Sequence, residues 1–448
     1  GYGHPSGPAV CRDTVIIGSS VTDGPTTRTN VPGRVLGFDA ESGALRWAFN
    51  LVPQDGEYGV DSWEEESWRY TGHANVWAPI SVDEDLGYVY LPTSTPSNDF
   101  YGGHRKGDNL FAESILFLDA ETGERVLHFQ TVHHGLWDYD NPAAPILCNI
   151  EVDGKPIKAL AQLTKQGFTF VLDRVTGEPV WPIEERSVPQ SSVPGEQTSP
   201  TQPFPTKPPA FVRQGVALDD LIDYTPEIRA RAEAILAHYN YGPLYTPPTL
   251  DRPTIVMPGW GGGANWPGGA FDPETGMLYV PSMQNATVIQ LTAPDPARSD
   301  FRYVRGRAEL ESIEGLDIFK GPYAKLTAID LNSGEIVWET VNGGEGPTDH
   351  PLLRDLDLPE MGTKARAGVL ATKTLLFATE GSGRSGSATG GGTKLRAIDK
   401  RSGEVHAAVE LPDQPTGVPM TYLVDDRQFI VVAVGSSPAR LIGLALPR

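Results

Sequence analysis

The stretch VLGFDAESGALRWAF, residues 35–49, contains a unit of strand, turn and strand that recurs along the chain and decides its fold. Further copies surround Asp119, Asp173, Asp330 and Asp399, in ILFLDAETGERVLHF, TFVLDRVTGEPVWPI, LTAIDLNSGEIVWET and LRAIDKRSGEVHAAV. Each copy places Asp-x-x-Ser/Thr-Gly between two apolar runs. The Asp side chain can cap backbone N–H groups of the turn, and the Gly takes the positive φ that closes a hairpin. The pattern therefore predicts five β-hairpins.

A large apolar residue follows the turn glycine in most copies. Trp47, Trp181 and Trp338 stand at this position, with Leu127 and Ala407 as smaller versions. Such a side chain can wedge between neighbouring units. The irregular spacing of the copies suits four-stranded blades that carry insertions, so we expect an all-β fold, a β-propeller.

Two further hairpins and one long insertion complete the expected layout. DEDLGYVYLP from Asp83 and DPETGMLYVP from Asp272 resemble inner strands of additional blades, so the interval between Asp173 and Asp330 is expected to hold at least one more blade. The insertion, 184–250, is proline-rich and then helical, with Thr225 as N-cap. We expect residues 1–448 to form one propeller domain, with this insertion over one end of its channel.

Composition excludes several classes of function. The chain has 448 residues, including 49 Gly and 40 Pro, a composition typical of many short strands joined by tight turns. Its formal charge of −21 argues against nucleic acid or an anionic membrane surface as a partner. Its 2 cysteines cannot build a disulfide framework or a zinc site by themselves.

The segment TVHHGLWDYDNPAAP, residues 131–145, could be a metal site, an acid/base centre or a decorated turn. Adjacent histidines on a strand point to opposite faces, so a supporting role is favoured over zinc binding. Burial of Asp138 beside Trp137 would raise its pKa towards use as a general base, unless a hard cation such as Ca²⁺ keeps it ionised. Lys165 lies in a strand-to-turn context. From these residues alone, the capped turn and the active site both remain open.

A second unusual segment is GWGGGANWPGG, residues 259–269, where 6 glycines surround Asn265 and Trp266. Glycine removes side chains where a flat ligand or another backbone must come close, and Asn offers both a donor and an acceptor. A purely structural turn remains an equal alternative.

Taken together, the motifs resemble those of a known family. The chain is similar to the quinoprotein dehydrogenases that use pyrroloquinoline quinone, most closely the membrane-type glucose branch with its quinate and polyol enzymes. The resemblance is carried by GSSVTDGPTTR, WAPISVDEDLGYVYLPTSTPSNDFYGG, FQTVHHGLWDYDNPAAPIL, LTKQGFTFVLDRVTGE, SPTQPF, NWPGGAFDPETGMLYV and PMTYLVDDRQFIVVAVG. It implies an eight-bladed propeller with tryptophan-docking repeats. It also implies oxidation of a sugar, polyol or cyclic alcohol.

The resemblance also implies roles for single residues in binding the cofactor. Asp138 matches the catalytic base that takes the proton of the substrate hydroxyl. Lys165 matches the residue that contacts the quinone oxygens, and Trp77 matches the indole that stacks on the cofactor ring. Asn265 and Trp266 match a pocket segment of the family.

A calcium site is implied in the same way. Asp23 matches an acidic ligand of the family, Thr95 stands where the glucose branch has Thr, and Asp138 supplies a third oxygen. The ion would hold Asp138 ionised and act as a Lewis acid.

The chain also departs from the family pattern. Gly135 replaces the acidic residue that usually follows the double His. Family members have a longer N-terminal part, so we expect a propeller that is incomplete at its N-terminus and needs that segment or a second chain. No Cys-x-x-Cys-His occurs in the sequence, so electrons would pass to a separate quinone or cytochrome. We expect the protein in the periplasm.

Two rival interpretations remain. One is a non-catalytic propeller scaffold that has lost its cofactor, and the other is a propeller hydrolase or lyase that uses Asp138 and a cation. The joint presence of Asp138, Lys165, Trp77 and Asn265 favours the quinoprotein over the scaffold. The role of Asp140 stays open.

Overall fold

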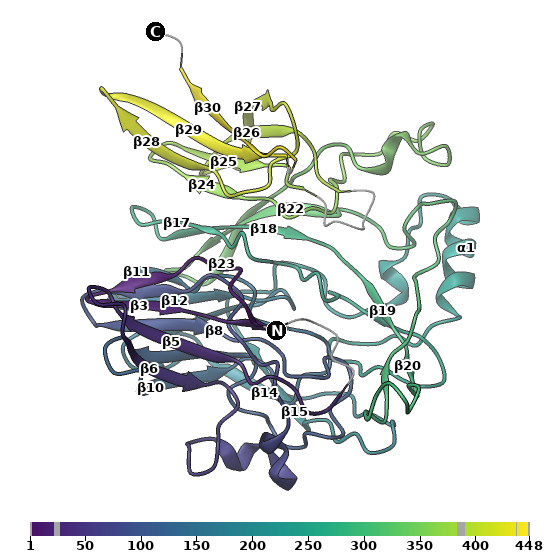
Figure 1. The fold of residues 1–448 in the computed structure, drawn as a ribbon. Coiled ribbons are helices and arrows are strands. Elements are labelled where there is room, and N and C mark those ends of the chain that lie inside the picture. Colours follow the sequence, from purple (N-terminus) through teal and green to yellow (C-terminus); the bar gives the residue numbers. More distant parts are fainter. Residues whose placement is uncertain (1, 22–26, 383–389, 436, 447–448) are drawn as a thin grey trace.

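The computed structural model describes residues 2–21, 27–382, 390–435 and 437–446. Within them, six antiparallel sheets of three or four strands follow one another along the chain, and we call them the first to sixth blades. Figure 1 shows the sixth blade at the top and the first, in purple, in the lower half.

The strands of each blade are hydrogen-bonded in chain order. The first blade contains β2 (Ala9–Cys11), β3 (Thr14–Ile17), β5 (Arg34–Asp39) and β6 (Leu45–Asn50). The second contains β7 (Ser81–Asp83), β8 (Tyr88–Pro92), β9 (Ser114–Asp119) and β10 (Arg125–Gln130). The third contains β11 (Ile146–Val152), β12 (Lys155–Leu163) and β13 (Thr169–Asp173).

The remaining blades follow the insertion. The fourth contains β17 (Ala270–Asp272), β18 (Met277–Met283), β22 (Ala324–Asp330) and β23 (Glu335–Val341). The fifth contains β24 (Val369–Ala371), β25 (Leu375–Thr379), β26 (Lys394–Asp399) and β27 (Val405–Glu410). The sixth contains β28 (Met420–Val424), β29 (Arg427–Val434) and β30 (Arg440–Ala445).

Shorter elements connect the blades. The two-stranded sheets pair β1 (Tyr2–Gly3) with β4 (Ser20–Val21), β14 (Ile183–Ser187) with β15 (Thr201–Pro205), β16 (Thr254–Val256) with β19 (Thr287–Ile289), and β20 (Leu291–Thr292) with β21 (Val304–Arg305). The helices are α1 (Pro226–Leu236) and the 3-10 turns Val60–Ser62, Glu64–Arg69, Leu218–Asp220 and Pro347–Asp349.

The first strands of successive blades lie next to one another. β2 contacts β7, β7 contacts β11, β11 contacts β17, and β17 contacts β24. This succession of inner strands is the arrangement of a propeller, which confirms the predicted architecture. Most long connections lie on one side of the blades, to the right in Figure 1.

The five repeats form the predicted turns. In the first, Asp39 Oδ1 accepts the Ser42 N–H at 2.7 Å, and Gly43 has φ 72°. In the second, Asp119 Oδ1 accepts the Thr122 N–H at 2.9 Å, and Gly123 has φ 73°. The third and fifth repeats are built alike, whereas in the fourth Asp330 Oδ1 accepts the Asn332 N–H at 2.9 Å and Asp330 Oδ2 accepts the Ser333 hydroxyl at 3.1 Å.

The residues after the turns dock on the following blade. Trp47 Nε1 donates to the Ala120 carbonyl at 3.0 Å, and Trp338 Nε1 donates to the Lys400 carbonyl at 3.1 Å. Both acceptors directly follow a repeat aspartate. The predicted wedging of these indoles between units is therefore observed.

The prediction of additional blades between Asp173 and Asp330 is wrong. The hairpins from Asp83 and Asp272 are β7–β8 and β17–β18, the inner strands of the second and fourth blades. They belong to the repeats that follow them, because a four-stranded blade needs two hairpins. Among the described residues, small two-stranded sheets and α1 occupy that interval instead.

The predicted helix of the insertion is confirmed. Thr225 Oγ1 accepts the Ile228 N–H at 3.2 Å, and Pro226 is the first residue of α1. Ile228, Ala232 and Leu236 face the apolar core beside β16 and β19. Among the described residues, no helix is both long enough and apolar enough to cross a membrane.

Candidate functional site

A cavity of about 240 Å³ opens at one end of the blades. Its walls come from segments that join one blade to the next and from turns inside the second and third blades. The described residues that line it are Pro5, Ser20, His73, Asn75, Trp77, Ser94, Asp99, Asp138, Asp140, Lys165, Trp260, Asn265 and Arg366. None of them comes from 184–250, so the position of that insertion over the channel stays a prediction.

Lys165 links the two aspartates at the wall of this cavity. It lies in the turn between β12 and β13, as its strand-to-turn context predicts. Its Nζ donates to Asp138 Oδ1 and to Asp140 Oδ2, each at 2.8 Å, and to the Asp138 carbonyl at 2.8 Å. Lys165 therefore pairs with Asp138, and Asp140 is a second partner.

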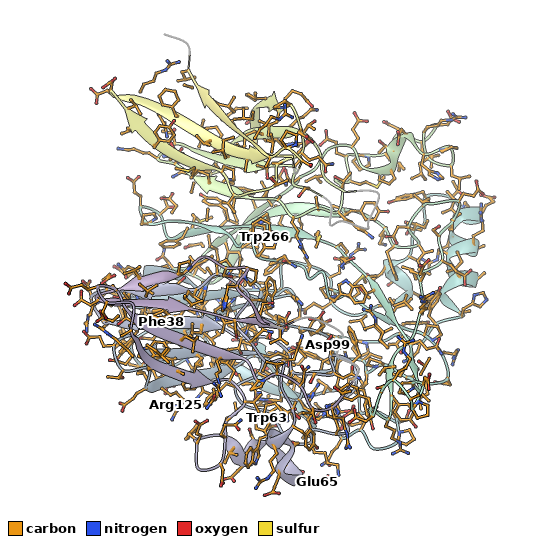
Figure 2. The ribbon with its side chains drawn as sticks, viewed as in Figure 1. Phe38, Trp63, Glu65, Asp99, Arg125 and Trp266 are labelled. Atoms are coloured by element: carbon orange, nitrogen blue, oxygen red, sulfur yellow. The ribbon has the colours of Figure 1, made fainter. Side chains whose placement is uncertain are left out.

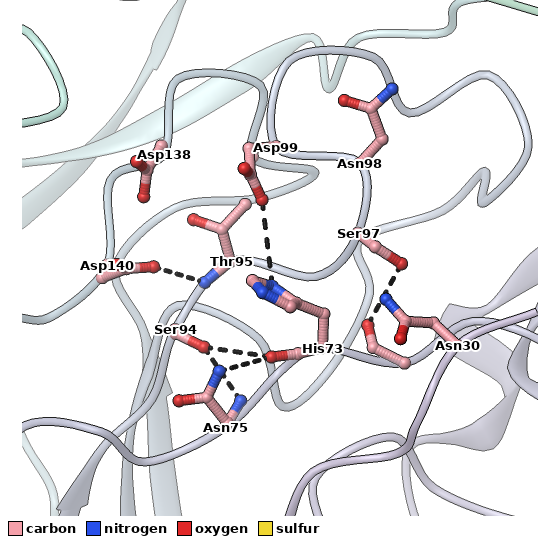
Figure 3. Close-up of polar contacts among 12 residues, drawn as sticks. Asn30, His73, Asn75, Ser94, Thr95, Ser97, Asn98, Asp99, Asp138 and Asp140 are labelled. Carbon is pink, nitrogen blue, oxygen red and sulfur yellow. Dashed lines mark hydrogen bonds and ion pairs between the residues drawn. The ribbon is translucent and has the colours of Figure 1, made fainter. Parts of the chain in front are cut away.

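Asp140 receives more hydrogen bonds than Asp138. Besides Lys165, its carboxylate accepts the Trp77 Nε1–H at 3.1 Å. It also accepts the Thr95 N–H at 2.7 Å (Figure 3). The carboxylate of Asp140 is thus taken up by three donors, and these bonds hold Lys165, Trp77 and Thr95 in place.

The two carboxyls consequently differ in acidity. Burial raises the pKa of Asp138 well above its usual range, and the charges of Asp140 and Asp99 add to this effect against the opposing Lys165. Burial would also raise the pKa of Asp140, but Lys165 and the other donors lower it to about 2. Asp138 is therefore the carboxyl better suited to accept a proton.

A buried glutamate lies behind this pair. Thr95 Oγ1 donates to Glu113 Oε1 at 2.9 Å, and Glu113 is fully buried. Burial and the charge of Asp140 raise the pKa of Glu113 to about 8. A Cβ added at Gly135 would overlap the Glu113 carboxylate. Glu113 therefore fills the space that a side chain at position 135 would need.

The two histidines do not lie on a strand, contrary to the prediction. β10 ends at Gln130, and the chain then bends, with φ 47° at His134 and 56° at Asp138. His134 contacts the Gly107 carbonyl and Glu196 Oε1, each at 2.8 Å. Its role is to tie this bend to the insertion, in agreement with the supporting function expected.

The glycine-rich segment packs on the turn of Lys165. The Gly263 N–H donates to the Lys165 carbonyl at 2.7 Å, and a Cβ at Gly262 would lie 3.0 Å from Lys165 Cα. Of the two reasons for glycine, close approach of another backbone is the one observed. Asn265 lines the cavity, with its Nδ2 bonded to the Gly261 carbonyl at 2.8 Å.

The remaining predicted residues divide into two groups. Trp77 and Asn265 line the cavity. Of the two tryptophans in the glycine-rich segment, Trp260 lines it and Trp266 (Figure 2) does not. Thr95 is buried behind the wall, and Asp23 lies outside the described residues.

Sequence reasoning missed eight residues of the wall: Pro5, Ser20, His73, Asn75, Ser94, Asp99, Trp260 and Arg366. His73 Nδ1 lies 3.9 Å from Asp99 Oδ1 (Figure 3). Alternation along a strand could not have found His73 and Asn75, because the segment before Trp77 forms no strand and His73 has φ 74°.

The cavity chemistry fits an anionic, flat cofactor and a hard cation. Lys165, Arg366 and the amides of Asn75 and Asn265 offer donors for carboxylates and quinone oxygens, while Trp77 and Trp260 offer aromatic walls. The carboxylates of Asp99, Asp138 and Asp140 are the oxygen donors that Ca²⁺ prefers. Among the described residues, however, no three acidic, His or Cys side chains are placed to hold an ion without rearrangement.

The sequence matches the family described as glucose/ethanol/alcohol dehydrogenase, beta-propeller domain, designated PQQ, over residues 1–430. The chain belongs to this family. Its pyrroloquinoline quinone (PQQ) affiliation agrees with the resemblance of the motifs.

Curated relatives carry related names. The glycerol dehydrogenase large subunit of Gluconobacter oxydans is 30% identical over 466 residues, which cover 96% of this chain and 60% of the relative. The quinoprotein glucose dehydrogenase of Escherichia coli is 30% identical over 472 residues, 97% of this chain and 56% of the relative. The chain therefore spans little more than half the length of these relatives.

Solved structures agree on the fold. The quinohemoprotein alcohol dehydrogenase from Comamonas testosteroni superposes with a TM-score of 0.65 at 22% identity, covering 96% of this chain and 56% of the other. A europium-containing methanol dehydrogenase gives a TM-score of 0.64 at 22% identity, covering 96% and 65%. These likenesses show that the PQQ family propeller is the fold of this chain.

Proposed function

We propose that the chain oxidises a hydroxyl-bearing carbon of a sugar, polyol or cyclic alcohol with PQQ as the electron acceptor. The observation that carries the proposal is the Lys165 ammonium, bonded to Asp138 and Asp140 on the wall of a cavity flanked by Trp77. When bound, the quinone would take up the hydride equivalent of the alcohol.

Asp138 would act as the general base. It faces the cavity, its pKa is raised by burial, and only Lys165 donates to its side chain among the hydrogen bonds described above. A substrate hydroxyl within reach of its free oxygen could transfer its proton there while hydride leaves the carbon.

Lys165 would bind the quinone oxygens. Its pKa is raised despite burial, because Asp138 and Asp140 face it, so it remains an ammonium at neutral pH. A fixed positive charge there would stabilise negative charge that develops on the cofactor oxygens. Asp140, Trp77 and Thr95 would orient these groups through the hydrogen bonds that Asp140 accepts.

Ca²⁺ would be held by Asp138, Thr95 and Asp23, and it would act as a Lewis acid. One structural neighbour is a europium-containing enzyme, so a lanthanide is the alternative ion. Asp99 is a further oxygen donor on the same wall and could replace one of these ligands.

The resemblance supports the wider setting. Electrons would leave to ubiquinone or a cytochrome, the protein would work in the periplasm, and a further segment or a second chain would complete the propeller.

Reconstitution with PQQ and Ca²⁺ tests the function. The holoprotein should keep quinone absorbance after dialysis and reduce a dye with glucose, quinate or glycerol. Loss of the absorbance on dialysis would favour the scaffold without cofactor. Turnover without added quinone would favour a hydrolase or lyase.

Asp138→Asn tests the base. Turnover should fall by about 10²- to 10⁴-fold, the usual contribution of a positioned base, while quinone absorbance is retained. Asp153→Asn in the exposed β11–β12 turn is the matched control and should keep full turnover. Full activity of Asp138→Asn would rule out its assignment as the base.

A further inference from the structure

The segment RSDFRYVRGR, residues 298–307, differs in charge from the rest of the chain, and we call it the arginine strip. It holds four arginines and one aspartate, whereas the whole chain has 57 Asp and Glu against 36 Lys and Arg. The aspartate, Asp300, pairs with Arg28 at 3.7 Å. The four arginines are exposed, and none of them forms a salt bridge with another described residue: Arg298, Arg302, Arg305 and Arg307. The strip therefore presents positive charge on a chain whose formal charge is −21.

The arginine strip lies against the loop that carries Asp99 to the cavity wall. Asn98 Nδ2 donates to the Tyr303 carbonyl at 2.9 Å. The rings of Tyr101 and Tyr303 meet edge to face, with their centres 5.2 Å apart. β21, which ends at Arg305, pairs with β20, and β20 lies on the side of the long connections (Figure 1). The strip is therefore close to the cavity wall.

Arg305 brings one of these charges onto a residue of the wall. Its guanidinium carbon lies 4.2 Å from the centre of the Trp260 ring and 5.5 Å from the centre of the Phe100 ring. Trp260 lines the cavity, and Phe100 directly follows Asp99, which also lines it. Stacking on two aromatic rings holds the guanidinium in place without a carboxylate that would neutralise it. Arg305 thus fixes a positive charge beside the cavity.

We propose that the arginine strip captures carboxylate-bearing ligands and steers them into the cavity. The identity of the ligand rests on the proposed function, under which it is PQQ itself, a tricarboxylate. The net charge of −21 repels such an anion at long range. At physiological salt, charges more than about 8 Å away are largely screened, so the nearby strip outweighs the distant acidic residues.

Stopped-flow tryptophan fluorescence of the whole chain, mixed with PQQ in the presence of Ca²⁺, tests the capture. The dependence of the observed rate on PQQ concentration gives kon and koff. The strip variant combines Arg302→Gln, Arg305→Gln and Arg307→Gln. The control variant changes the net charge equally at exposed positions in the β2–β3 turn, in α1 and in the turn of the fifth repeat: Arg12→Gln, Arg231→Gln and Arg401→Gln. Both variants should keep the wild-type Tm, because the replaced side chains are exposed.

We expect kon of the strip variant to be about tenfold lower than that of the wild type at about 0.1 M salt, with koff changed by less than about twofold. At about 1 M salt, where the screening length is about 3 Å, the two proteins should have the same kon. The control variant should keep the wild-type kon. The uncharged trimethyl ester of PQQ should bind the wild type and the strip variant at equal rates.

A second readout needs no cofactor. The fluorescence of Trp260 is obtained as the difference between each protein and its Trp260→Phe form, and it is quenched with iodide or with caesium ions. The ratio of iodide quenching to caesium quenching should be about fivefold lower in the strip variant, because the strip no longer concentrates anions beside Trp260. The control variant should keep the wild-type ratio.

An unchanged kon, a loss confined to koff, an equal loss in the control variant or an unchanged quenching ratio would overturn the capture. A different result would separate the capture from the proposed function. If the wild type binds no PQQ while its preference for iodide depends on the strip, the proposed function fails and the capture of anions is still supported.

Discussion

Glu113 and Gly135 act as a complementary pair at the scale of single residues. The family pattern suggested only that an acidic side chain had been lost at position 135. The structure places a carboxyl in the same space from the residue that precedes β9, bonded to Thr95. A carboxyl from another part of the chain therefore occupies the space next to Gly135.

This pairing predicts non-additive effects on stability. Gly135→Ala should destabilise the protein by about 1 to 3 kcal/mol, because the new methyl group overlaps the Glu113 carboxylate. In the background of Glu113→Ala, the same change should cost much less. Denaturant unfolding of the four proteins of this double-mutant cycle measures the difference.

Gly7→Ala is the control, because a Cβ at Gly7 has no described neighbour within 4 Å and the residue has no positive φ. An equal cost of Gly135→Ala with and without Glu113 would show that the two residues are independent.

At the scale of elements, ion pairs between buried side chains join neighbouring blades. Asp83, at the end of β7, accepts Arg174 Nε at 2.8 Å, and Asp272, at the end of β17, accepts Lys400 Nζ at 2.6 Å. Each cation directly follows a repeat aspartate of the next blade. The inner hairpins, which resembled strands of additional blades, thus supply the aspartates of the ion pairs between neighbouring blades.

These pairs predict a stability that depends on pH. Burial would raise the pKa of Asp83, but Arg174 and the backbone N–H of Leu86 hold it below its usual value. A lowered folded-state pKa means that the contribution is full above about pH 4 and is lost as pH falls through the folded pKa. Asp83→Asn should cost about 3 kcal/mol at pH 7, and this difference from wild type should shrink below pH 4.

Urea unfolding at several pH values measures this difference. Glu184→Gln, in an exposed pair with Arg186, is the control and should change stability by less than about 0.5 kcal/mol. A cost for Asp83→Asn that is the same at pH 7 and pH 3 would argue against the ion pair.

The docking tryptophans are the second link between blades. Trp47→Ala should cost about 3 to 5 kcal/mol, because Trp47 is only 8% exposed and its loss leaves a cavity over Gly123. Trp47→Phe should cost less, since it keeps most apolar contacts and loses the bond to the Ala120 carbonyl. Thermal unfolding separates the two variants, and equal costs would assign the whole effect to the hydrogen bond.

At the scale of the whole molecule, several contacts fasten the insertion near the site, and the buried Glu196 makes two of them. Glu196 meets His134 at 2.8 Å and accepts the Gly102 N–H at 2.6 Å, and both of its partners belong to segments next to the cavity wall. Despite burial, these bonds hold the pKa of Glu196 below its usual range. The insertion and the bend that carries Asp138 are therefore mechanically connected.

Glu196→Ala should loosen this connection. Hydrogen exchange of 189–200 should accelerate, because the buried His134 and the Gly102 N–H lose their partner. Apparent affinity for PQQ should fall in reconstitution, whereas Glu184→Ala on the exposed face of β14 should alter neither quantity. Unchanged exchange in Glu196→Ala would mean that the other contacts of the insertion, such as those of Gln202 and Thr246, are enough to hold it.

The repeated hairpins could be predicted from the amino-acid sequence, because each Asp-x-x-Ser/Thr-Gly turn is closed by bonds between neighbours in the chain. Local pattern also sufficed for the cap of α1, whereas the roles of Asp138 and Lys165 were expected from the resemblance to the family. Local pattern failed where hairpins had to be assigned to blades, since pairing of hairpins depends on contacts between distant strands.

Which residues line the cavity, in contrast, is decided only by the folded chain. Asp99, His73 and Arg366 reach it from irregular segments, where no periodicity tells which way a side chain points. The same holds for Trp260, which lines the cavity in place of Trp266, and for Asp140, whose role follows from three donors in separate segments. Hydrogen bonds between distant segments set these positions, and they exist only once the blades have packed.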